Sequence, residues 1–333
     1  MAAGQTFDFV SHLYHQTSVD WEIEELVGGV SNHTVRARRR KNPNSDENEG
    51  SGDYYDAMKP YGSVVLKQAP AYLAKAQHIP FSPYRQAIEA AALRLLHQSI
   101  GEHKFGLREV LIKNPNIIVP RILLEDTTHN VIIQSDLGNY PNLHEVLVSP
   151  DITLSLAVEL GQTIGHFLAN LHDVSHFSHN SPVVKTFMNI DAERVIQSNI
   201  GLATQCMKDA GIVDYEVLGK LALDHWNNRD KTAFGQGDIW FGTLLVNLYS
   251  RRPSDLDATV ATVGICDWEF AGPNHPAADI AQLGLLFFFE FDLFDIILPS
   301  ATLYRLISPF TVDVSVELFS RKGSSHGLLG IVI

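Results

Sequence analysis

Two acidic residues that follow apolar, strand-like segments are the best placed in this sequence to do chemistry. Asp238 lies in the segment 234–243 (FGQGDIWFGT), and Asp267 directly follows the segment 263–266 (VGIC). A carboxylate beside an apolar strand is costly to bury unless it is paired or binds a metal ion. The stretch 249–262 is rich in Arg, Ser, Pro and Asp, which is typical of a hairpin connection that would bring the two aspartates together. Two turn aspartates that cap their strands remain an alternative of equal weight.

Short strands in the first third of the chain and helices in the rest must position these aspartates. Apolar and β-branched runs between turns predict strands at 21–27, 33–38, 64–67, 117–124 and 130–134. Apolar residues at helical spacing predict helices at 84–98, 154–172, 213–226 and 277–291. The polar stretch at about 39–60 lacks the apolar residues of a core, so it is expected to be a solvated loop insertion. The chain is therefore expected to have a strand-rich first lobe and a helix-rich second lobe, joined near residue 137.

Composition excludes several classes of protein. The 333 residues include 38 acidic and 25 basic side chains, and the net charge of −13 disfavours a chain-wide role in binding nucleic acid or an anionic membrane. Two cysteines form no disulfide framework and no zinc-binding spacing, which favours a reduced, cytoplasmic setting. No signal peptide and no uninterrupted apolar span are expected. The basic run 36–41 is expected to be the solvated end of a hairpin rather than a nucleic-acid patch.

The order of four motifs resembles the aminoglycoside phosphotransferase/choline kinase-like family, which has a protein-kinase-like fold. The segments QGD (236–238) and DWE (267–269) are similar to its catalytic loop and its metal-binding Asp-x-Glu motif. The segments 65–70 (VLKQAP) and 84–93 (YRQAIEAAAL) are similar to its lysine strand and glutamate helix. Within the family, the sequence most resembles the 5-methylthioribose kinases. The resemblance covers roughly residues 21–290.

This resemblance implies an α+β, two-lobed kinase fold with a small antiparallel-sheet N-lobe at 1–137 and a larger helical C-lobe at 138–333. It implies an ATP- and Mg²⁺-dependent enzyme that phosphorylates a hydroxyl group of a small molecule, such as a sugar or an amino alcohol. No nucleic-acid or membrane partner is expected.

The resemblance also implies a role for individual residues. Asp238 is the expected catalytic residue, which accepts or orients the proton of the substrate hydroxyl. The residues expected to bind the nucleotide, partly through backbone groups, are Lys67, Glu89, Gly29, Ser31, Asn32, Ser135 and Leu137. The residues expected to bind the metal ion are Asp267, Glu269 and Thr243. Asp279 is expected to brace the catalytic loop.

The sequence departs from the family pattern at two positions of the loop. Gln236 replaces the usual histidine, and Thr243 replaces the usual metal-binding asparagine. Glu269 is expected to compensate, because residues two apart on an extended segment point to the same side. The stretch after Asp279 is short for the family, which leaves the acceptor open. A catalytically impaired, kinase-like nucleotide-binding or scaffold protein is therefore the alternative interpretation.

Overall fold

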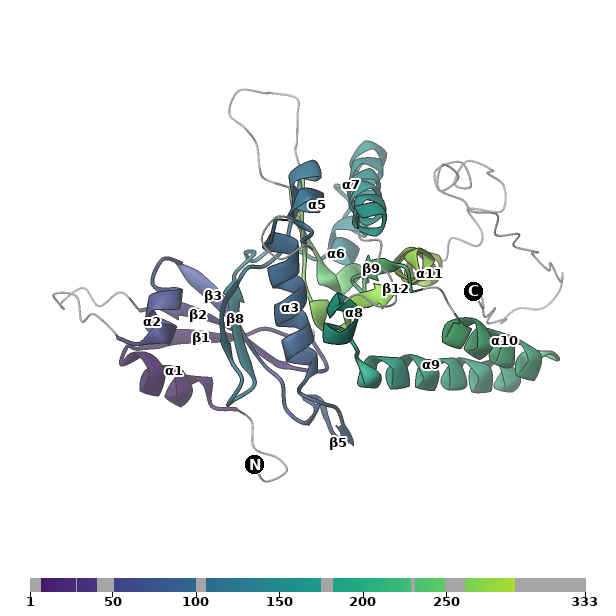
Figure 1. Ribbon diagram of the computed structural model, residues 1–333. Coiled ribbons are helices and arrows are strands. Elements are labelled where there is room, and N and C mark those ends of the chain that lie inside the picture. The colour runs from purple at the N-terminus through teal and green to yellow at the C-terminus, as the bar shows by residue number, and fades with distance from the viewer. Residues whose placement is uncertain are drawn as a thin grey trace. The chain divides into compact units, whose positions relative to one another are not determined.

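The computed structural model describes residues 7–27, 29–40, 51–99, 106–174, 182–228, 231–248 and 261–290 (Figure 1). The chain divides into two compact units, one of Met1–Ala192 with Asp230–Asp279 and one of Glu193–Arg229 with Ile280–Ile333. An antiparallel sheet near the N-terminus precedes a mainly helical remainder, so the predicted α+β class is confirmed. The lobe boundary expected at residue 137 falls inside the first unit and stays a prediction. The short C-terminal stretch discussed above lies largely outside the described residues.

A five-stranded antiparallel sheet carries the first half of the first unit. Its strand order is β1-β2-β3-β8-β7, so neighbours along the chain are mostly neighbours in space. The strands are β1 (Trp21–Glu25), β2 (His33–Arg39), β3 (Ser63–Gln68), β7 (Ile122–Asp126) and β8 (Val131–Ser135). In this register Lys67 of β3 lies opposite Thr34 on one side and Ile132 on the other, at the middle of the sheet.

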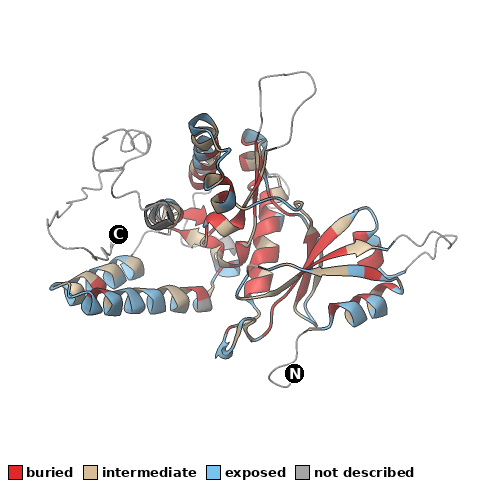
Figure 2. Cartoon of the chain, turned by 180° about the vertical axis from the view of Figure 1, so that it is seen from behind, coloured by how far each residue is buried: buried red, intermediate tan, exposed pale blue. Residues whose placement is uncertain are grey.

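The two faces of this sheet have different partners. Helices α1 (Phe9–Thr17) and α2 (Asp53–Met58) share a hydrophobic core with Val64 and Leu66 of β3. Lys67 points away from that core, because successive side chains on a strand alternate between faces, and it meets helix α3 (Arg85–His97). Figure 2 shows the buried residues concentrated on these strands and on α3. The alternation thus separates a structural face from the face that holds the site.

Helix α2 corrects the expectation of a solvated loop at 39–60. Three of its six residues, Tyr54, Tyr55 and Met58, are buried, and they pack the segment onto the sheet. Their spacing places them together on one side of a single helical turn, a pattern too short to stand out against the polar residues around it. The part of the predicted loop at 41–50 lies outside the described residues.

The strand expected at 117–124 is two strands in different sheets. Val119 and Pro120 interrupt it, and Pro120 has no backbone N–H to continue a ladder. β6 (Ile117–Ile118) pairs in parallel with β11 (Thr262–Ile265), which pairs with β10 (Leu244–Asn247). The antiparallel β10–β11 pair shows that the chain between the two proposed catalytic aspartates does return on itself. β9 (Ala233–Gly235) and β12 (Gly272–Asn274) form another short ladder beside them, and β4 (Tyr72–Leu73) pairs with β5 (Ala76–Pro80).

Helices account for most of the rest of the described chain. They are α5 (Arg108–Lys113), α6 (Leu143–Leu147), α7 (Leu154–Val174), α8 (Pro182–Thr186), α9 (Ile190–Asp209), α10 (Tyr215–Asn228) and α11 (Pro276–Glu290). The predicted helices at 84–98, 154–172, 213–226 and 277–291 correspond to α3, α7, α10 and α11. Within the described residues, no helix is both long enough and apolar enough to cross a membrane.

The second unit contains most of α9 and all of α10. The Trp226 indole N–H donates to a Glu193 carboxylate oxygen at 2.9 Å, which joins the start of α9 to the end of α10. Gly219 lies where the helices meet, and a Cβ atom there would come within 2.3 Å of the Thr204 side chain. A glycine therefore permits the close approach of the two helices.

The basic run 36–41 was expected to be solvated, but its first residue, Arg36, is buried. Its side chain is 4% exposed and does not extend into solvent. Its Nε donates to Asp136 Oδ2 at 2.6 Å, and Nη2 donates to Asp136 Oδ1 at 3.1 Å. This bidentate pair ties β2 to the segment that follows β8, and Ser63 of β3 also donates to Asp136. Sequence analysis missed the pair because its partners are 100 positions apart.

We predict that Arg36→Ala lowers the free energy of unfolding by about 3 kcal/mol, because it leaves Asp136 buried without its guanidinium partner. Urea titration followed by far-ultraviolet circular dichroism measures the change. Arg38→Ala is the matched control on the same strand. Arg38 pairs with Glu24 through side chains that are each 43% exposed, so it should change stability by less than about 0.5 kcal/mol. Equal effects of the two substitutions would contradict the prediction.

Candidate active site

A buried lysine joined to two carboxylates forms the centre of the candidate site. Lys67 is 3% exposed, and its Nζ donates to Glu89 Oε1 at 2.8 Å and to Asp267 Oδ1 at 2.7 Å. Glu89 comes from α3 and is also buried, whereas Asp267 comes from the turn after β11. The structure therefore contains the expected Lys67–Glu89 pair and adds a direct contact between Lys67 and Asp267.

The electrostatics of this cluster hold Lys67 in its charged form. Burial alone lowers the pKa of Lys67, but the negative charges of Asp267, Glu89 and Glu269 outweigh burial, so the pKa is raised. Burial raises the pKa of the Glu89 carboxyl group, and the positive charge of Lys67 opposes that rise. Because Nζ lies 2.7 Å from Glu89 Oε2, the ion pair is the dominant form. A fixed buried cation of this kind can bind phosphate oxygens.

Gln236 connects the loop of Asp238 to the segment of Asp267. Its Nε2 donates to the backbone carbonyls of Cys266 at 3.0 Å and Asp267 at 2.7 Å, and its Oε1 accepts the Asp238 backbone N–H at 2.7 Å. An amide side chain carries both donors and acceptors, so Gln236 performs all three contacts at once. Gln236 thus forms a buried structural link between the two segments.

Asp279 braces the same loop from the start of α11. Its carboxylate accepts the backbone N–H groups of Gln236 at 3.0 Å and Gly237 at 2.9 Å, and His172 Nε2 lies 3.1 Å from Oδ2. Gly237 has φ +85°, and a Cβ atom there would come within 2.2 Å of the Phe270 carbonyl oxygen. Only glycine fits this turn, and the turn fixes the backbone that carries Asp238.

Thr243 uses its hydroxyl to close the 3₁₀ turn η1 (Phe241–Thr243). Its Oγ1 donates to the Trp240 carbonyl at 2.9 Å and accepts the Trp240 backbone N–H at 3.2 Å. A hydroxyl has one proton and two lone pairs, so these contacts leave one lone pair. The metal-binding role expected for Thr243 stays a prediction. Trp240 itself is 40% exposed next to Asp238, whereas Trp268 is fully buried.

Glu269 does not share a side with Asp267 in the way the sequence analysis assumed. Asp267 has a left-handed backbone, with φ +57°, and the 3₁₀ turn η2 (Trp268–Phe270) follows it directly. The segment is therefore not extended, and the period-two rule does not apply to it. That premise of the prediction is wrong, although the metal-binding role of Glu269 stays untested.

The carboxylate of Glu269 instead holds the turn between β1 and β2. Ser31 Oγ donates to Oε1, and Asn32 Nδ2 donates to Oε2 at 2.8 Å. Arg85 Nε lies 3.3 Å from the same Oε2, while Arg85 Nη2 donates to the Ser31 carbonyl at 2.8 Å. Gly29, with no atom near its missing Cβ, lies at the open end of this turn. The structure thus brings Ser31 and Asn32 to the Asp-x-Glu segment.

Arg85 is a site residue that sequence analysis missed. It is 1% exposed, and besides Ser31 it binds the carbonyl oxygens of Phe81 and Ser82 and the Asn32 side chain. It lies four positions before Glu89, one helical turn away on the same face of α3. That spacing is the only signal in the sequence that could have identified it.

Ser135 and Leu137, which lie at and just after the end of β8 and were expected to bind the nucleotide, have different surroundings. The Ser135 backbone N–H donates to the Arg121 carbonyl at 2.9 Å, so this amide belongs to the sheet and is not presented to a ligand. Leu137 packs on β11, where a Cβ on Gly264 would lie 2.9 Å from Leu137 Cδ1. A nucleotide contact through the Ser135 N–H would need this group to exchange partners, and the nucleotide contact expected for Leu137 stays a prediction.

Comparisons with known proteins bear on this geometry. No family model matches the chain. It is 27% identical over 225 residues to a 4-hydroxytryptamine kinase of Psilocybe cubensis, a match that covers 66% of this chain and 58% of the relative. The 4-hydroxytryptamine kinase of Psilocybe cyanescens is 26% identical over 225 residues, and this match also covers 66% of this chain and 58% of the relative. In sequence, the chain resembles small-molecule kinases. The match spans less than two thirds of each relative's length.

Several solved structures are also similar. One is a spectinomycin phosphotransferase bound to ADP and spectinomycin, with a TM-score of 0.44 and 16% identity, and the match covers 84% of this chain and 74% of that chain. Another is an aminoglycoside phosphotransferase of Streptomyces rimosus, with a TM-score of 0.46 and 14% identity, covering 89% of this chain and 87% of that chain. A third is a choline kinase of Cryptosporidium parvum, with a TM-score of 0.37 and 14% identity, covering 79% of this chain and 62% of that chain. The sequence relatives and these structures are named as small-molecule kinases or phosphotransferases, which is the class of protein that the four motifs resemble. The closer resemblance to 5-methylthioribose kinases stays a prediction.

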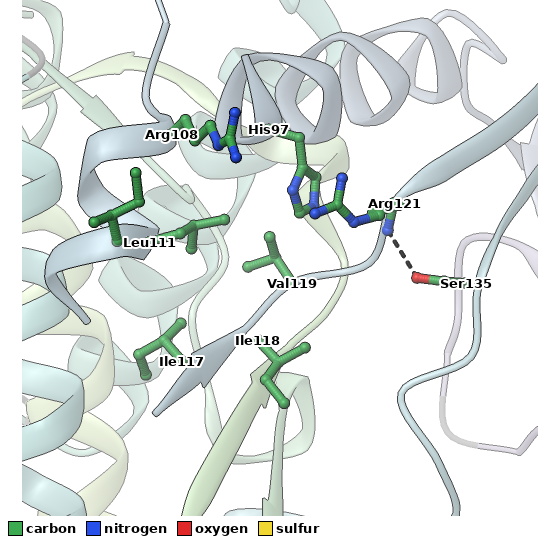
Figure 3. Close-up of a pocket in the computed structure, with 9 residues that line it drawn as sticks. His97, Arg108, Leu111, Ile117, Ile118, Val119, Arg121 and Ser135 are labelled. Atoms are coloured by element: carbon green, nitrogen blue, oxygen red, sulfur yellow. Dashed lines mark hydrogen bonds between the residues drawn. The ribbon is translucent and has the colours of Figure 1, made fainter. Parts of the chain in front are cut away.

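A cavity of about 370 Å³ adjoins Ser135 on the side of Arg121 (Figure 3). His97, Arg108 and Arg121 line it together with apolar residues of α5 and β6. Burial, followed by the charge of Arg121, lowers the pKa of His97. His97 is therefore neutral at pH 7, and the positive character of the cavity comes from the two arginines. The Lys67 cluster is not among its walls.

We predict that Asp279→Asn lowers the free energy of unfolding by about 2–3 kcal/mol, because an amide replaces a charged acceptor of two buried N–H groups. Its NH₂ group would also face a backbone donor. Chemical denaturation measures the effect, and hydrogen exchange at the Gln236 and Gly237 amides should accelerate. Asp151→Asn, at an exposed turn, is the control and should leave both unchanged. Unaltered exchange at these amides in Asp279→Asn would refute the bracing role.

Proposed function

We propose that this chain is an ATP- and Mg²⁺-dependent kinase that transfers the γ-phosphoryl group to a hydroxyl of a small molecule. The observation that carries the proposal is the buried Lys67 ammonium, held by Glu89 of α3 and Asp267 of the β11 turn. Phosphoryl transfer depends mainly on positioning and on neutralising charge on phosphate oxygens. A lysine fixed in this way is suited to the phosphates of a nucleotide. The sequence relatives, both named as kinases of 4-hydroxytryptamine, support the same reaction class.

The donor set near Lys67 fits a hard divalent cation. Carboxylate and hydroxyl oxygens are the ligands that Mg²⁺ accepts, and the segment offers the Asp267 carboxylate, the Glu269 carboxylate and the Thr243 hydroxyl. Asp267 is the principal ligand in this proposal, because its side chain contacts Lys67 and is still 41% exposed. When bound, Mg²⁺ would neutralise charge on the β- and γ-phosphate oxygens.

Asp238 is the proposed base. Its carboxylate would accept the proton of the acceptor hydroxyl while that oxygen forms a bond to the γ-phosphorus and the bond from the γ-phosphorus to the bridging oxygen of ADP breaks. Gln236 and Asp279 fix the backbone on each side of this step. Ser31 and Asn32 would bind phosphate oxygens after they leave Glu269.

The acceptor is proposed to be a hydroxylated amine or sugar. The relatives' name describes an aryl hydroxyl on an amine-bearing molecule, and the acidic chain favours a cation. Trp240, half-exposed beside Asp238, could contact such a cation through its ring. The cytoplasmic location expected from the cysteine content stays a prediction.

Asp238→Asn should reduce phosphoryl transfer by about 10²–10⁴-fold, because the amide no longer accepts a proton. Its affinity for a non-hydrolysable ATP analogue with Mg²⁺, measured by calorimetry, should remain within about twofold. Turnover is measured as ADP release with 4-hydroxytryptamine, choline and aminoglycosides as trial acceptors. Asp151→Asn is the control and should match the wild type. Full turnover by Asp238→Asn would overturn the assigned role.

A second candidate is a nucleotide-binding protein with impaired catalysis. It is favoured by the contacts of two expected metal ligands: Thr243 already closes η1, and Glu269 already holds Ser31 and Asn32. Asp267 would then be the remaining ligand of the three. In that case nucleotide binding would depend little on Mg²⁺.

The magnesium dependence of nucleotide affinity separates the two candidates. If Glu269 is a ligand, Glu269→Gln should reduce the ratio of affinities measured with and without Mg²⁺ by about tenfold or more, since losing metal-shell groups costs about 10–100-fold. Ser31→Ala removes one donor to Glu269 without altering a carboxylate, so it should not reduce this ratio. A ratio that Glu269→Gln leaves at the wild-type value assigns Glu269 to the turn alone and favours the impaired protein.

A further inference from the structure

A cluster of two histidines and an aspartate lies on the sheet face opposite Lys67. Each of His12, Asp126 and His129 offers one ligand atom, and these three atoms lie within 4.8 Å of one another. His12 comes from α1, Asp126 from the end of β7, and His129 from the turn between β7 and β8. Asp126 lies opposite Val131, a member of the core under α1 and α2, so its side chain is on that face. None of the proposed catalytic residues takes part.

The aspartate is already oriented as a ligand. Its Oδ1 accepts the backbone N–H groups of Thr128 at 2.9 Å and His129 at 3.1 Å, which fixes the carboxylate in the turn. Its Oδ2 is left to face the cluster, 2.7 Å from His129 Nδ1 and 3.9 Å from His12 Nε2. Hydrogen bonds that hold the outer oxygen of a carboxylate ligand are the usual support of a metal site.

The two imidazoles are close enough to share an ion. Their ring centroids are 4.8 Å apart, and the His12 side chain is only 8% exposed. Each imidazole can bind a metal ion through one ring nitrogen.

We propose that His12, Asp126 and His129 form a Zn²⁺ site that fastens helix α1 to the β7–β8 hairpin. Two imidazole nitrogens and one carboxylate oxygen are a ligand set that zinc uses, with water completing four-coordination. Hard ions such as Mg²⁺ prefer all-oxygen sites, so the two proposed metal sites select different ions. The site would add a cross-link between segments more than 100 positions apart in the chain.

Zinc binding needs only local proton shifts. In the structure Tyr54 Oη donates to Asp126 Oδ2 at 2.6 Å, so His12 Nε2 donates to Tyr54 Oη at 3.0 Å. Coordination by His12 Nε2 would move the proton of this ring to Nδ1. Coordination by His129 Nδ1 would move the proton of that ring to Nε2. Tyr54 Oη keeps its proton in the hydrogen bond that it donates to Asp126. Tyr54 is thus a neighbour of the ion and not a ligand.

The test is Zn²⁺ binding to the full chain in a Cys206→Ser background, which removes an exposed thiol. Equilibrium dialysis with excess Mg²⁺ and no nucleotide should show one tight Zn²⁺ per chain. His12→Gln and His129→Gln should each weaken this site at least about 100-fold, the upper cost of disturbing its supporting shell. His15→Gln, an exposed histidine on the same helix, and Tyr54→Phe should retain it.

Three further readouts make the outcome decisive. Co²⁺ in place of Zn²⁺ should give the visible absorption of a four-coordinate site, lost in the two ligand variants. Circular dichroism verifies that each variant is folded, and Asp126→Asn provides a third ligand substitution if one of the others fails to fold. Asp267→Asn should leave Zn²⁺ binding intact, which separates this site from the proposed kinase site. Failure to bind Zn²⁺, or equal binding by wild type and both histidine variants, would overturn the proposal.

Discussion

The burial of the Lys67 ammonium constrains the rest of the candidate site. An isolated charge in this position would be very costly, so carboxylates must reach it from other segments, and Glu89 and Asp267 do so from α3 and the β11 turn. Such a buried pair adds little net stability compared with apolar packing. Its presence agrees with the phosphate-binding role proposed for Lys67. The sheet, α3 and β11 must keep their relative positions for the cation to remain paired.

The loop of Asp238 depends on a second buried network, formed by Asp279, Gln236 and backbone groups. Asp279 satisfies two backbone donors of this loop, and Gln236 links it to the carbonyls of Cys266 and Asp267. A fully connected polar network is rigid, whereas a partly satisfied one is costly. Gln236 can complete this network because its amide offers both donors and an acceptor.

The sequence predicted those parts of the site that short segments encode. The strand of Lys67, the helix of Glu89 and the two aspartate motifs each have a local pattern, and their order indicated the fold. Three features had no local pattern: the Arg36–Asp136 pair, the side chain of Arg85 and the direction of Glu269. The first two depend on partners in distant segments. The third failed because a left-handed residue at Asp267 turns the chain where period two was assumed.

Glu269 is therefore the residue on which the two proposed functions diverge. Its Oε1 accepts Ser31, whereas its Oε2 accepts Asn32 and lies 3.3 Å from Arg85 Nε, so the two lone pairs of Oε2 are in use and one lone pair of Oε1 remains. A metal ion bound by both oxygens of Glu269 would therefore displace Asn32 or Arg85 from Oε2 and let the turn move away. If the turn moves, its hydroxyl and amide groups become available to phosphate oxygens at the same time. In that case, metal binding and closure of the turn over the nucleotide would be one coupled step.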